Sequence, residues 1–466
     1  MKRGELPHRL SYRDAAFANF ERHSFPMNVG SVGVYEGEIP FAQFFTHVGS
    51  RIQLVPAYRQ RLIEVPGRFE HAAWINDPDF DVRCHVNSVT LPPPGNEAQL
   101  AHAAGEFFAT PLRRDRPLWE IRLVEGLSGG RSAHLAKAHH CLVDGIGAAR
   151  LFGVLFDTTP EVRPLPQRRP PDLSPLPDRL MLAVDAVFDR ALEQVRLAEC
   201  TALTLLHPRA TIRSVRSVMR ALCAADPYIA VPAPPTPWGM RLHAPDRVAW
   251  QSLPFDEVRT ISTSLGGTIN DLALTLVAGG LARYLESQSV PTEGLVLRVG
   301  LPVNVRRHTR SETAANRVSM MLAGLPVGEP DARARFHVIH KEIFELERRR
   351  QAAGIEELME RLGDLPPVLH VLTGRWLTMP NNLTNLICTN VPGPRSPLYL
   401  LGHRMLEHYP WVPLGWRMGL SVAVMRYDAG LCFGITGDHQ IPGDISIVAA
   451  GIRESFDELR ETTTGT

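Results

Sequence analysis

Two adjacent histidines followed by an acid and a glycine are the strongest chemical signal in this sequence. The stretch from His139 to Gly145 is HHCLVDG. A neutral imidazole can remove a proton from a hydroxyl group near neutral pH, because its unperturbed pKa of about 6.5 keeps a useful fraction unprotonated. The stretch therefore predicts a general base. A structural histidine is the common alternative for a pair of histidines without further context.

The flanking sequence predicts a strand that leads into the histidines and a helix that follows them. Residues 133–138 form an extended run of small and apolar side chains, and residues 146–156 are apolar at helical spacing without a proline. Successive side chains of a strand point to opposite faces. We therefore expect His139 and His140 to point opposite ways, one into packing and the other toward a cavity.

The acid and the glycine are predicted to shape the loop. Asp144 is better suited to hold the loop through an arginine or backbone amides than to act as a second base. Gly145 permits a positive φ that other residues tolerate poorly. Cys141 beside His140 raises the hypothesis of a Cys–His nucleophile, which we do not favour because neighbours in an extended chain face apart. The arginines available to Asp144 are Arg13, Arg306 and Arg395.

The full HHxxxDG string resembles the signature of the CoA-dependent acyltransferase superfamily, which includes condensation domains and polyketide-associated acyltransferases. Further segments resemble the bacterial wax ester synthase/diacylglycerol acyltransferase family, in the same order and along nearly the whole chain. Two departures are visible: the segment from Pro237 to Arg241 lacks an asparagine-rich opening, and Cys141 replaces the more usual alanine. The first departure bears on acceptor or acyl-chain preference. The resembling segments are Leu10-Ser11 with Asp14, Met27–Gly30, Arg59–Leu62, Trp74 with Asp77-Pro78 and Phe80-Asp81, Pro117–Glu120, Asn270-Asp271, Pro302–Arg306 and Thr389–Pro394.

The resemblance implies a fold and an activity. The fold would be α/β, with two chloramphenicol-acetyltransferase-like sandwich domains and an active-site tunnel at their interface. The activity would be acyl transfer from acyl-CoA to a hydroxyl group, forming triacylglycerol from diacylglycerol or wax ester from a long-chain alcohol. His140 would be the base, with His139, Asp144 and Asn270 as further catalytic candidates. Acyl-CoA would be a co-substrate, and no cofactor or metal is implied, since the histidines lack ligand spacing.

Asn270 and Asp271 open a predicted helix from Thr268 to Leu285. Thr268 and Asp271 have the spacing of a capping box, which accounts for Asp271 as a helix-initiating residue. Asn270 lies in the first turn, where unpaired N–H groups and the positive end of the helix dipole suit a thioester carbonyl that gains negative charge. The resemblance places both residues at the border of the active site.

Two proline-containing motifs are predicted to be structural parts of the site. Pro117, Leu118 and Trp119 form a turn before a strand, and an indole has no necessary role in acyl transfer, so Trp119 is interpreted as a core or tunnel-wall residue. The motif Thr389–Pro394 ends an apolar strand, predicted over Leu383–Cys388, in a rigid turn. The resemblance places that strand across the domain seam. The residues of this second motif that we assign to the site are Asn390, Pro392 and Gly393.

The composition favours a globular chain of two halves. The 466 residues carry a net charge of +1, which argues against a nucleic-acid binder. The six cysteines are scattered without CxxC spacing and are interpreted as reduced cytosolic thiols. Neither a signal-peptide core nor an apolar stretch long enough to cross a bilayer is evident, so any contact with the inner membrane or with lipid inclusions should be peripheral.

Proline clusters divide the chain into an N-terminal half over 1–160, a linker over 161–226 and a C-terminal half over 227–466. The linker ends in a long amphipathic helical region, predicted over Asp178–Cys223, which either packs on the core or contacts lipid.

Three other functions stay open at this point. A condensation-type enzyme would use a carrier-protein thioester, and a secondary-metabolite or polyketide O-acyltransferase would differ in its acceptor. A non-catalytic lipid-inclusion protein could retain the same fold. The preferred acceptor, the acyl length and the oligomeric state are not determined by the sequence.

Overall fold

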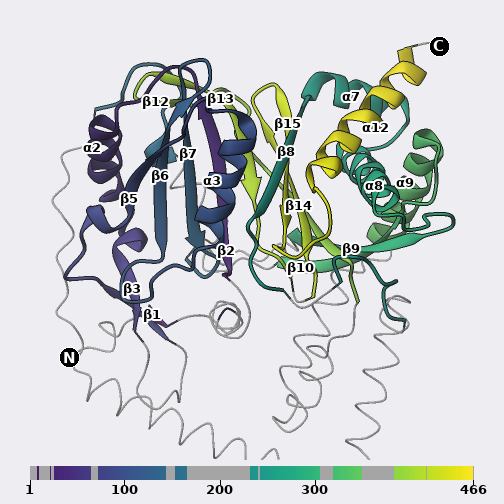
Figure 1. The fold of residues 1–466 in the computed structure, drawn as a ribbon, viewed down its shortest axis with the longest axis horizontal. Helices are drawn as coiled ribbons and strands as arrows, with labels where there is room; N and C mark the ends of the chain where they lie inside the picture. Colours follow the sequence, from purple (N-terminus) through teal and green to yellow (C-terminus); the bar gives the residue numbers. More distant parts are fainter. Residues whose placement is uncertain are drawn as a thin grey trace, which may run out of the picture.

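The computed structural model describes residues 8–9, 21, 26–63, 72–142, 153–164, 231–239, 242–304, 318–348, 383–415 and 417–464. Their strands form two six-stranded sheets and one small three-stranded sheet, and the two large sheets lie side by side (Figure 1). The predicted linker helix and several site residues lie outside the described residues. These site residues are Asp144 and Gly145, with Arg13 and Arg306 among the arginines considered for Asp144.

The first large sheet has the strand order β12-β13-β2-β7-β6-β5, and β7 in its middle ends at His139. The small sheet has the order β1-β4-β3. Helix α2 lies on the outer side of the first sheet and α3 on the side nearer the second (Figure 1). The bounds are β1 His8–Arg9, β2 Asn28–Tyr35, α2 Phe41–Ile52, β3 Gln60–Ile63, β4 Ala73–Asn76, β5 Val86–Thr90, α3 Glu97–Ala109, β6 Trp119–Leu127 and β7 Arg131–His139, with 3-10 turns at Pro56–Arg59 and Val82–Cys84.

The second large sheet has the order β10-β9-β11-β14-β15-β8, and its helices gather on the side away from the first sheet (Figure 1). Helix α8 is almost entirely buried in the core of this half. The bounds are β8 Arg247–Pro254, α7 Phe255–Ser264, α8 Ile269–Ser287, β9 Val296–Asn304, β10 Val318–Pro326, α9 Ala332–Arg348, β11 Leu386–Val391, β12 Tyr399–Leu400, β13 His403–Trp411, β14 Leu420–Tyr427, β15 Gly430–Gly437 and α12 Ser446–Thr464.

Strands β12 and β13 cross from the second half of the chain into the first sheet. Strand β13 pairs antiparallel with β2, where Pro410 lies opposite Ser31. A side chain at Gly434 in β15 would overlap the carbonyl of Pro410, so the two sheets approach closely at this point. Trp250 stacks on Tyr409 with ring centroids 5.3 Å apart. The division of the sequence into halves does not anticipate this crossing, because the pattern of a strand does not reveal its partner.

Lys137 fixes β7 against α3 on one face of the sheet. Its ammonium group is buried and donates to the carbonyls of Phe107 and Thr110, at 2.6 and 2.7 Å, at the C-terminal end of α3. A cation is favourable there, because the last carbonyls of a helix lack helical partners. Burial lowers the pKa of Lys137, while Glu120 at 3.3 Å opposes that shift.

In the part of the chain that the structure describes, no single helix has the length and apolar composition needed to cross a membrane. Helices α7 and α8 reach that length and composition only when taken together, and they are bent by 101° relative to each other.

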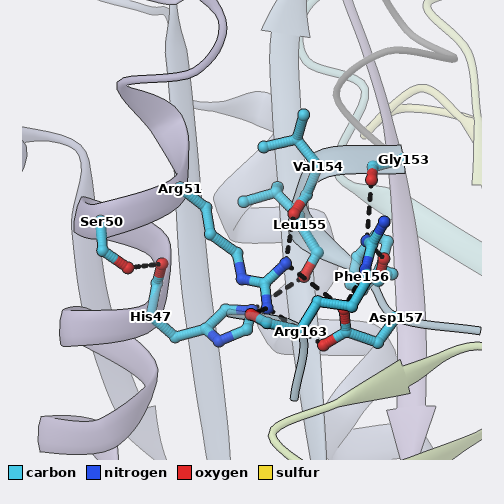
Figure 2. A network of polar contacts seen from close by, with 9 residues as sticks. All are labelled: His47, Ser50, Arg51, Gly153, Val154, Leu155, Phe156, Asp157 and Arg163. Carbon is cyan, nitrogen blue, oxygen red and sulfur yellow. Dashed lines mark hydrogen bonds and ion pairs between the residues drawn. The ribbon is translucent and has the colours of Figure 1, made fainter. Parts of the chain in front are cut away.

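An ionic network holds residues 153–157 against α2 (Figure 2). These residues include the end of the helix predicted after the histidines. Arg51 of α2 lies 3.1 Å from the Asp157 carboxylate, and Arg163 lies 2.6 Å from its other oxygen. The backbone of Asp157 exchanges hydrogen bonds with Tyr399 of β12. Asp157 therefore joins α2 through its carboxylate and the crossing strand β12 through its backbone.

We predict that Asp157→Asn destabilises the protein strongly. The substitution leaves the buried Arg51 charge without its anion, and loss of one partner of a buried ion pair costs roughly 3 kcal/mol. Urea unfolding followed by circular dichroism measures the change. Asp115→Asn is the control, because Asp115 pairs with Arg113 at an exposed site. Equal unfolding midpoints for the two variants would contradict the stabilising role of the Asp157 network.

Candidate active site at the end of β7

The two histidines lie at the end of β7. His139 is the last residue of β7 and pairs with Asn28, and its N–H donates to the Leu118 carbonyl at 2.9 Å. The strand ends there: the N–H of His140 donates to the Met27 carbonyl at 2.8 Å, and His140 begins a turn that the N–H of Leu142 closes on the His139 carbonyl at 2.8 Å. His139 is buried and His140 is half-buried. The predicted strand therefore ends between the two histidines, and the opposite orientation of His140 stays a prediction.

His139 belongs to a buried chain of polar groups. Its Nδ1 accepts the N–H of Cys141 at 3.1 Å and lies 2.8 Å from the Cys141 thiol. Because Nδ1 is an acceptor here, we assign the ring proton of the neutral imidazole to Nε2. Nε2 lies 3.4 Å from Glu21 Oε2, and that carboxylate accepts a hydrogen bond from Arg114 at 2.7 Å.

The charge on Glu21 is stabilised despite its position. Burial by itself would raise the pKa of this carboxyl group, but the contacts with His139 and Arg114 outweigh burial and the pKa is lowered. Glu21 is thus an anion facing the Nε2 side of His139. The sequence analysis did not identify Glu21 or Arg114, since neither has a local pattern that points to His139.

The bond from Cys141 to His139 fixes the backbone around His140. It links the side chain of one residue to the N–H two residues later, as an asparagine does in an Asx turn. His140 is the residue enclosed by this turn, and its own N–H is held by Met27. The Cys141 thiol lies 2.8 Å from His139 Nδ1.

The start of α8 confirms the predicted capping box. The N–H of Asp271 donates to Thr268 Oγ1 at 3.2 Å, and Asp271 Oδ2 accepts from the Thr268 N–H at 2.8 Å. The same buried oxygen lies 2.8 Å from His340 Nδ1 of α9, a partner that the sequence did not suggest. Asp271 is therefore committed to the helix terminus and to the α8–α9 contact.

Asn270 and Asn390, predicted from two separate motifs, meet in the structure. Asn390 Nδ2 donates to Asn270 Oδ1 at 3.4 Å, which brings the end of β11 to the first turn of α8. Since the oxygen of Asn270 is engaged, its own Nδ2 donors point away from Asn390. Asn270 is half-buried and can contribute these donors to a ligand.

The motif around Trp119 is part of the core, as the interpretation of Trp119 as a structural residue expected. Trp119 is 1% exposed, and its indole N–H donates to the Tyr58 carbonyl at 2.8 Å. Its ring stacks on His85 with centroids 4.4 Å apart. Pro117 and Leu118 are buried beside it. The motif therefore supports the end of β7, where the Leu118 carbonyl binds His139.

The second proline motif differs from its prediction in two ways. The strand does not end at Cys388, because β11 continues to Val391 and the turn begins at Pro392. It also lies inside the second sheet, between β9 and β14, and the crossing to the first sheet follows it. A side chain at Gly393 would overlap the Arg426 carbonyl, which explains the glycine. The pairing of Asp144 with an arginine lies outside the described residues and stays a prediction.

Comparison with known proteins identifies the family. A model of the wax ester synthase/diacylglycerol acyltransferase catalytic domain matches residues 10–273, and a model of the C-terminal domain of the same proteins matches residues 314–460. The chain belongs to the wax ester synthase/diacylglycerol acyltransferase family. A putative diacylglycerol O-acyltransferase of Mycobacterium bovis is 30% identical, with 97% of this chain and 95% of the relative covered. Another of Mycobacterium tuberculosis is 31% identical, with 97% and 90% covered.

Solved structures agree on the fold. The wax ester synthase/diacylglycerol acyltransferase of Marinobacter aquaeolei VT8 has a TM-score of 0.69 at 24% identity, with 98% of this chain and all of that chain covered. The first condensation domain of the calcium-dependent antibiotic synthetase has a TM-score of 0.59 at 16% identity, with 98% and 97% covered. The predicted fold class, two α/β halves of the chloramphenicol-acetyltransferase type, is confirmed.

We predict that His139→Asn retains most of kcat, whereas His139→Gln loses it. The asparagine oxygen occupies the place of Nδ1 and can accept the Cys141 N–H, while the glutamine amide corresponds to Nε2 and leaves that N–H without its acceptor. Steady-state kinetics of acyl transfer measure kcat and KM, and thermal unfolding checks the fold of both variants. A proton-transferring His139 would instead make the two variants equally inactive, because neither amide is a base.

Proposed function

We propose that the chain is an acyl-CoA-dependent O-acyltransferase that forms neutral lipid, either triacylglycerol from diacylglycerol or wax ester from a long-chain alcohol. The observation that carries this proposal is the division of roles at the end of β7. Nδ1 of His139 accepts the Cys141 N–H and its Nε2 lies 3.4 Å from the Glu21 carboxylate, while the half-buried His140 lies within the turn that follows. Family membership supplies the chemistry that this arrangement supports.

The reaction requires one proton transfer in each direction. The neutral imidazole of His140 takes the proton from the acceptor hydroxyl as its oxygen attacks the thioester carbon. The tetrahedral intermediate then collapses with cleavage of the carbon–sulfur bond, and the imidazolium returns the proton to the CoA thiolate. A covalent acyl-enzyme is unnecessary, because the thioester is already activated and a fixed base can gain much of its advantage from positioning.

Asn270 supports the developing oxyanion in this proposal. Its oxygen accepts from Asn390, so its amide N–H groups are oriented as donors at the N-terminal end of α8. The positive end of the helix dipole adds to their effect. Asp144 and Gly145 keep their proposed roles in shaping the loop. Pro117, Leu118, Trp119 and Gly393 hold the surrounding backbone.

The partners in this proposal are acyl-CoA and a lipid acceptor with a free hydroxyl group. Such acceptors reside in membranes or lipid inclusions, so we propose that the protein works in the cytoplasm at the surface of the inner membrane or of lipid inclusions. The near-neutral net charge is compatible with a peripheral contact governed more by apolar surface than by charge.

We predict that His140→Ala abolishes acyl transfer. Purified protein is incubated with palmitoyl-CoA and either dipalmitin or hexadecanol, and both CoA release and lipid product are followed. Loss of a general base lowers the rate by roughly 10² to 10⁴. The variant should unfold at the same temperature as the native chain. Undiminished product from the variant would overturn the proposal, and product formed only from a carrier-protein thioester would indicate a condensation-type reaction.

We predict that Asn270→Ala lowers kcat by about 10² and leaves KM for acyl-CoA nearly unchanged, because an oxyanion donor acts mainly in the transition state. Asp271→Ala serves as the comparison. It removes the capping interaction and should lower stability by about 1 kcal/mol with a smaller effect on kcat. A larger loss of kcat in Asp271→Ala than in Asn270→Ala would contradict the assignment of Asn270.

A further inference from the structure

A cavity of about 40 Å³ lies inside the first half, between α2 and the sheet. Phe44 and Val48 of α2 form its roof. Its floor is a straight row across three strands, because Ser31 of β2 and Ile121 of β6 both pair with Ala136 of β7. The cavity therefore lies directly over the strand that ends beside the proposed base.

The small side chain of Ala136 creates this space. Ala136 lies in the middle of a central strand, yet it is half-buried, whereas its neighbours Leu135 and Lys137 are fully buried. Protein interiors are normally packed without voids of this size. A void beneath an ordered helix, on the strand of the site, calls for a functional explanation.

The cavity is suited to an apolar guest. Its accessible lining is almost entirely carbon, and an ordered water needs two to four polar partners, so an apolar cavity of this kind stays dry. The His134 ring is part of the lining and binds the Tyr35 hydroxyl through Nδ1 at 2.7 Å. Burial lowers the pKa of His134 to about 3, so the imidazole brings no charge at neutral pH.

The cavity and His140 both lie along β7, the cavity over its middle and His140 directly after its last residue. The side chains of Ala136 and Ala138 point to the face that carries the cavity, because side chains alternate along a strand. Between the cavity and His140, the side chain on this face is the methyl group of Ala138. Four residues of strand span about 13 Å. An extended hydrocarbon advances about 1.3 Å per carbon, so roughly ten carbons separate a group reacting at His140 from the cavity.

One wall of the cavity is held rigidly. Leu155 and Phe156 line it, and the carbonyl of Leu155 contacts His47 Nε2 at 2.8 Å. Arg51 donates to the Val154 carbonyl at 3.0 Å, next to its ion pair with Asp157 (Figure 2). A wall fixed by buried hydrogen bonds and charge resists displacement by a longer guest. Rigid closure of this kind is what discrimination by length requires.

We propose that this cavity receives the terminal carbons of a long aliphatic chain whose reacting end lies at His140, and that its volume sets the preferred chain length. The inference rests on the proposed function and extends it to a subsite. This aliphatic chain belongs either to the acyl donor or to the alcohol acceptor, because both carry a long hydrocarbon tail. The competing explanation is a packing defect that no substrate enters.

Three substitutions of similar size test the subsite. Ala136→Val fills the cavity from the floor and Val48→Ala enlarges it from the roof. Val32→Ala is the matched control, because Val32 is equally buried on β2 but does not line the cavity. One series varies saturated acyl-CoA from C8 to C20 with a fixed acceptor, and a second varies the alcohol with a fixed acyl-CoA. Product formation is measured as kcat/KM at each length.

We expect Ala136→Val to move the optimum in one series to shorter chains and Val48→Ala to move it to longer chains, with the Val32→Ala profile unchanged. One methylene in a fitted pocket changes kcat/KM by about tenfold or more. The series whose optimum shifts identifies whether the acyl chain or the alcohol chain enters the cavity. A higher melting temperature for Ala136→Val, with both length profiles unchanged, would overturn the proposal and identify a packing defect.

A binding measurement separates failure of the subsite from failure of the proposed reaction. Calorimetric titration of His140→Ala protein with acyl-CoA and alcohols of different length needs no turnover. A length preference that follows the Ala136 and Val48 substitutions on this background supports the subsite even if the native chain proves inactive. If native turnover depends on His140 but neither cavity substitution changes the length dependence of binding or of kcat/KM, the reaction is supported and the subsite is refuted.

Discussion

The register between β2 and β7 is the constraint on which the site depends. Side chains alternate along a strand, so a slip of one residue would turn His139 to the opposite face. Several interactions oppose such a slip. Lys137 meets two carbonyls at the end of α3, and His139 meets Glu21, and both contacts require the observed register. Buried charged groups with fixed partners specify a register more sharply than apolar side chains, because each is costly to leave unpaired.

The crossing of β12 and β13 makes the two halves one structure. The sheet that carries His139 is completed by strands that come late in the chain, next to β2. Asp157 ties the same crossing to the segment after the histidines through its backbone pairing with Tyr399. Helix α3 makes a second close contact between the halves, because a side chain at Gly105 would overlap the carbonyl of Asp246. The site is therefore assembled from distant parts of the chain, and loss of the crossing would expose the edge of β2.

The polar groups around β7 divide into fully buried and half-buried ones. Three of these groups are buried and contact specific partners, and they stabilise the fold: Lys137, His139 and the Arg51–Asp157 pair. His140 and Asn270 are half-buried, and in the proposed function they contact substrate. The proposed apolar subsite lies over the middle of β7, between α2 and the sheet, and Lys137 meets α3 on the opposite face.

The sequence by itself determined the local features. HHxxxDG with its companion motifs predicted the family, the opposite orientation of His139 and His140 stays a prediction from strand geometry, and Thr268 with Asp271 predicted a capping box that the structure contains. Each of these depends on residues a few positions apart, so local hydrogen bonding and sterics suffice to predict it.

The tertiary structure decided which distant groups meet. Arg114 and Glu21 are 93 residues apart and Asn270 and Asn390 are 120 apart, and no local pattern links either pair. The same holds for β13 beside β2 and for the cavity over Ala136. Such contacts arise because packing brings whole elements together, and the free energy of one pairing depends on all the others that bury the same core.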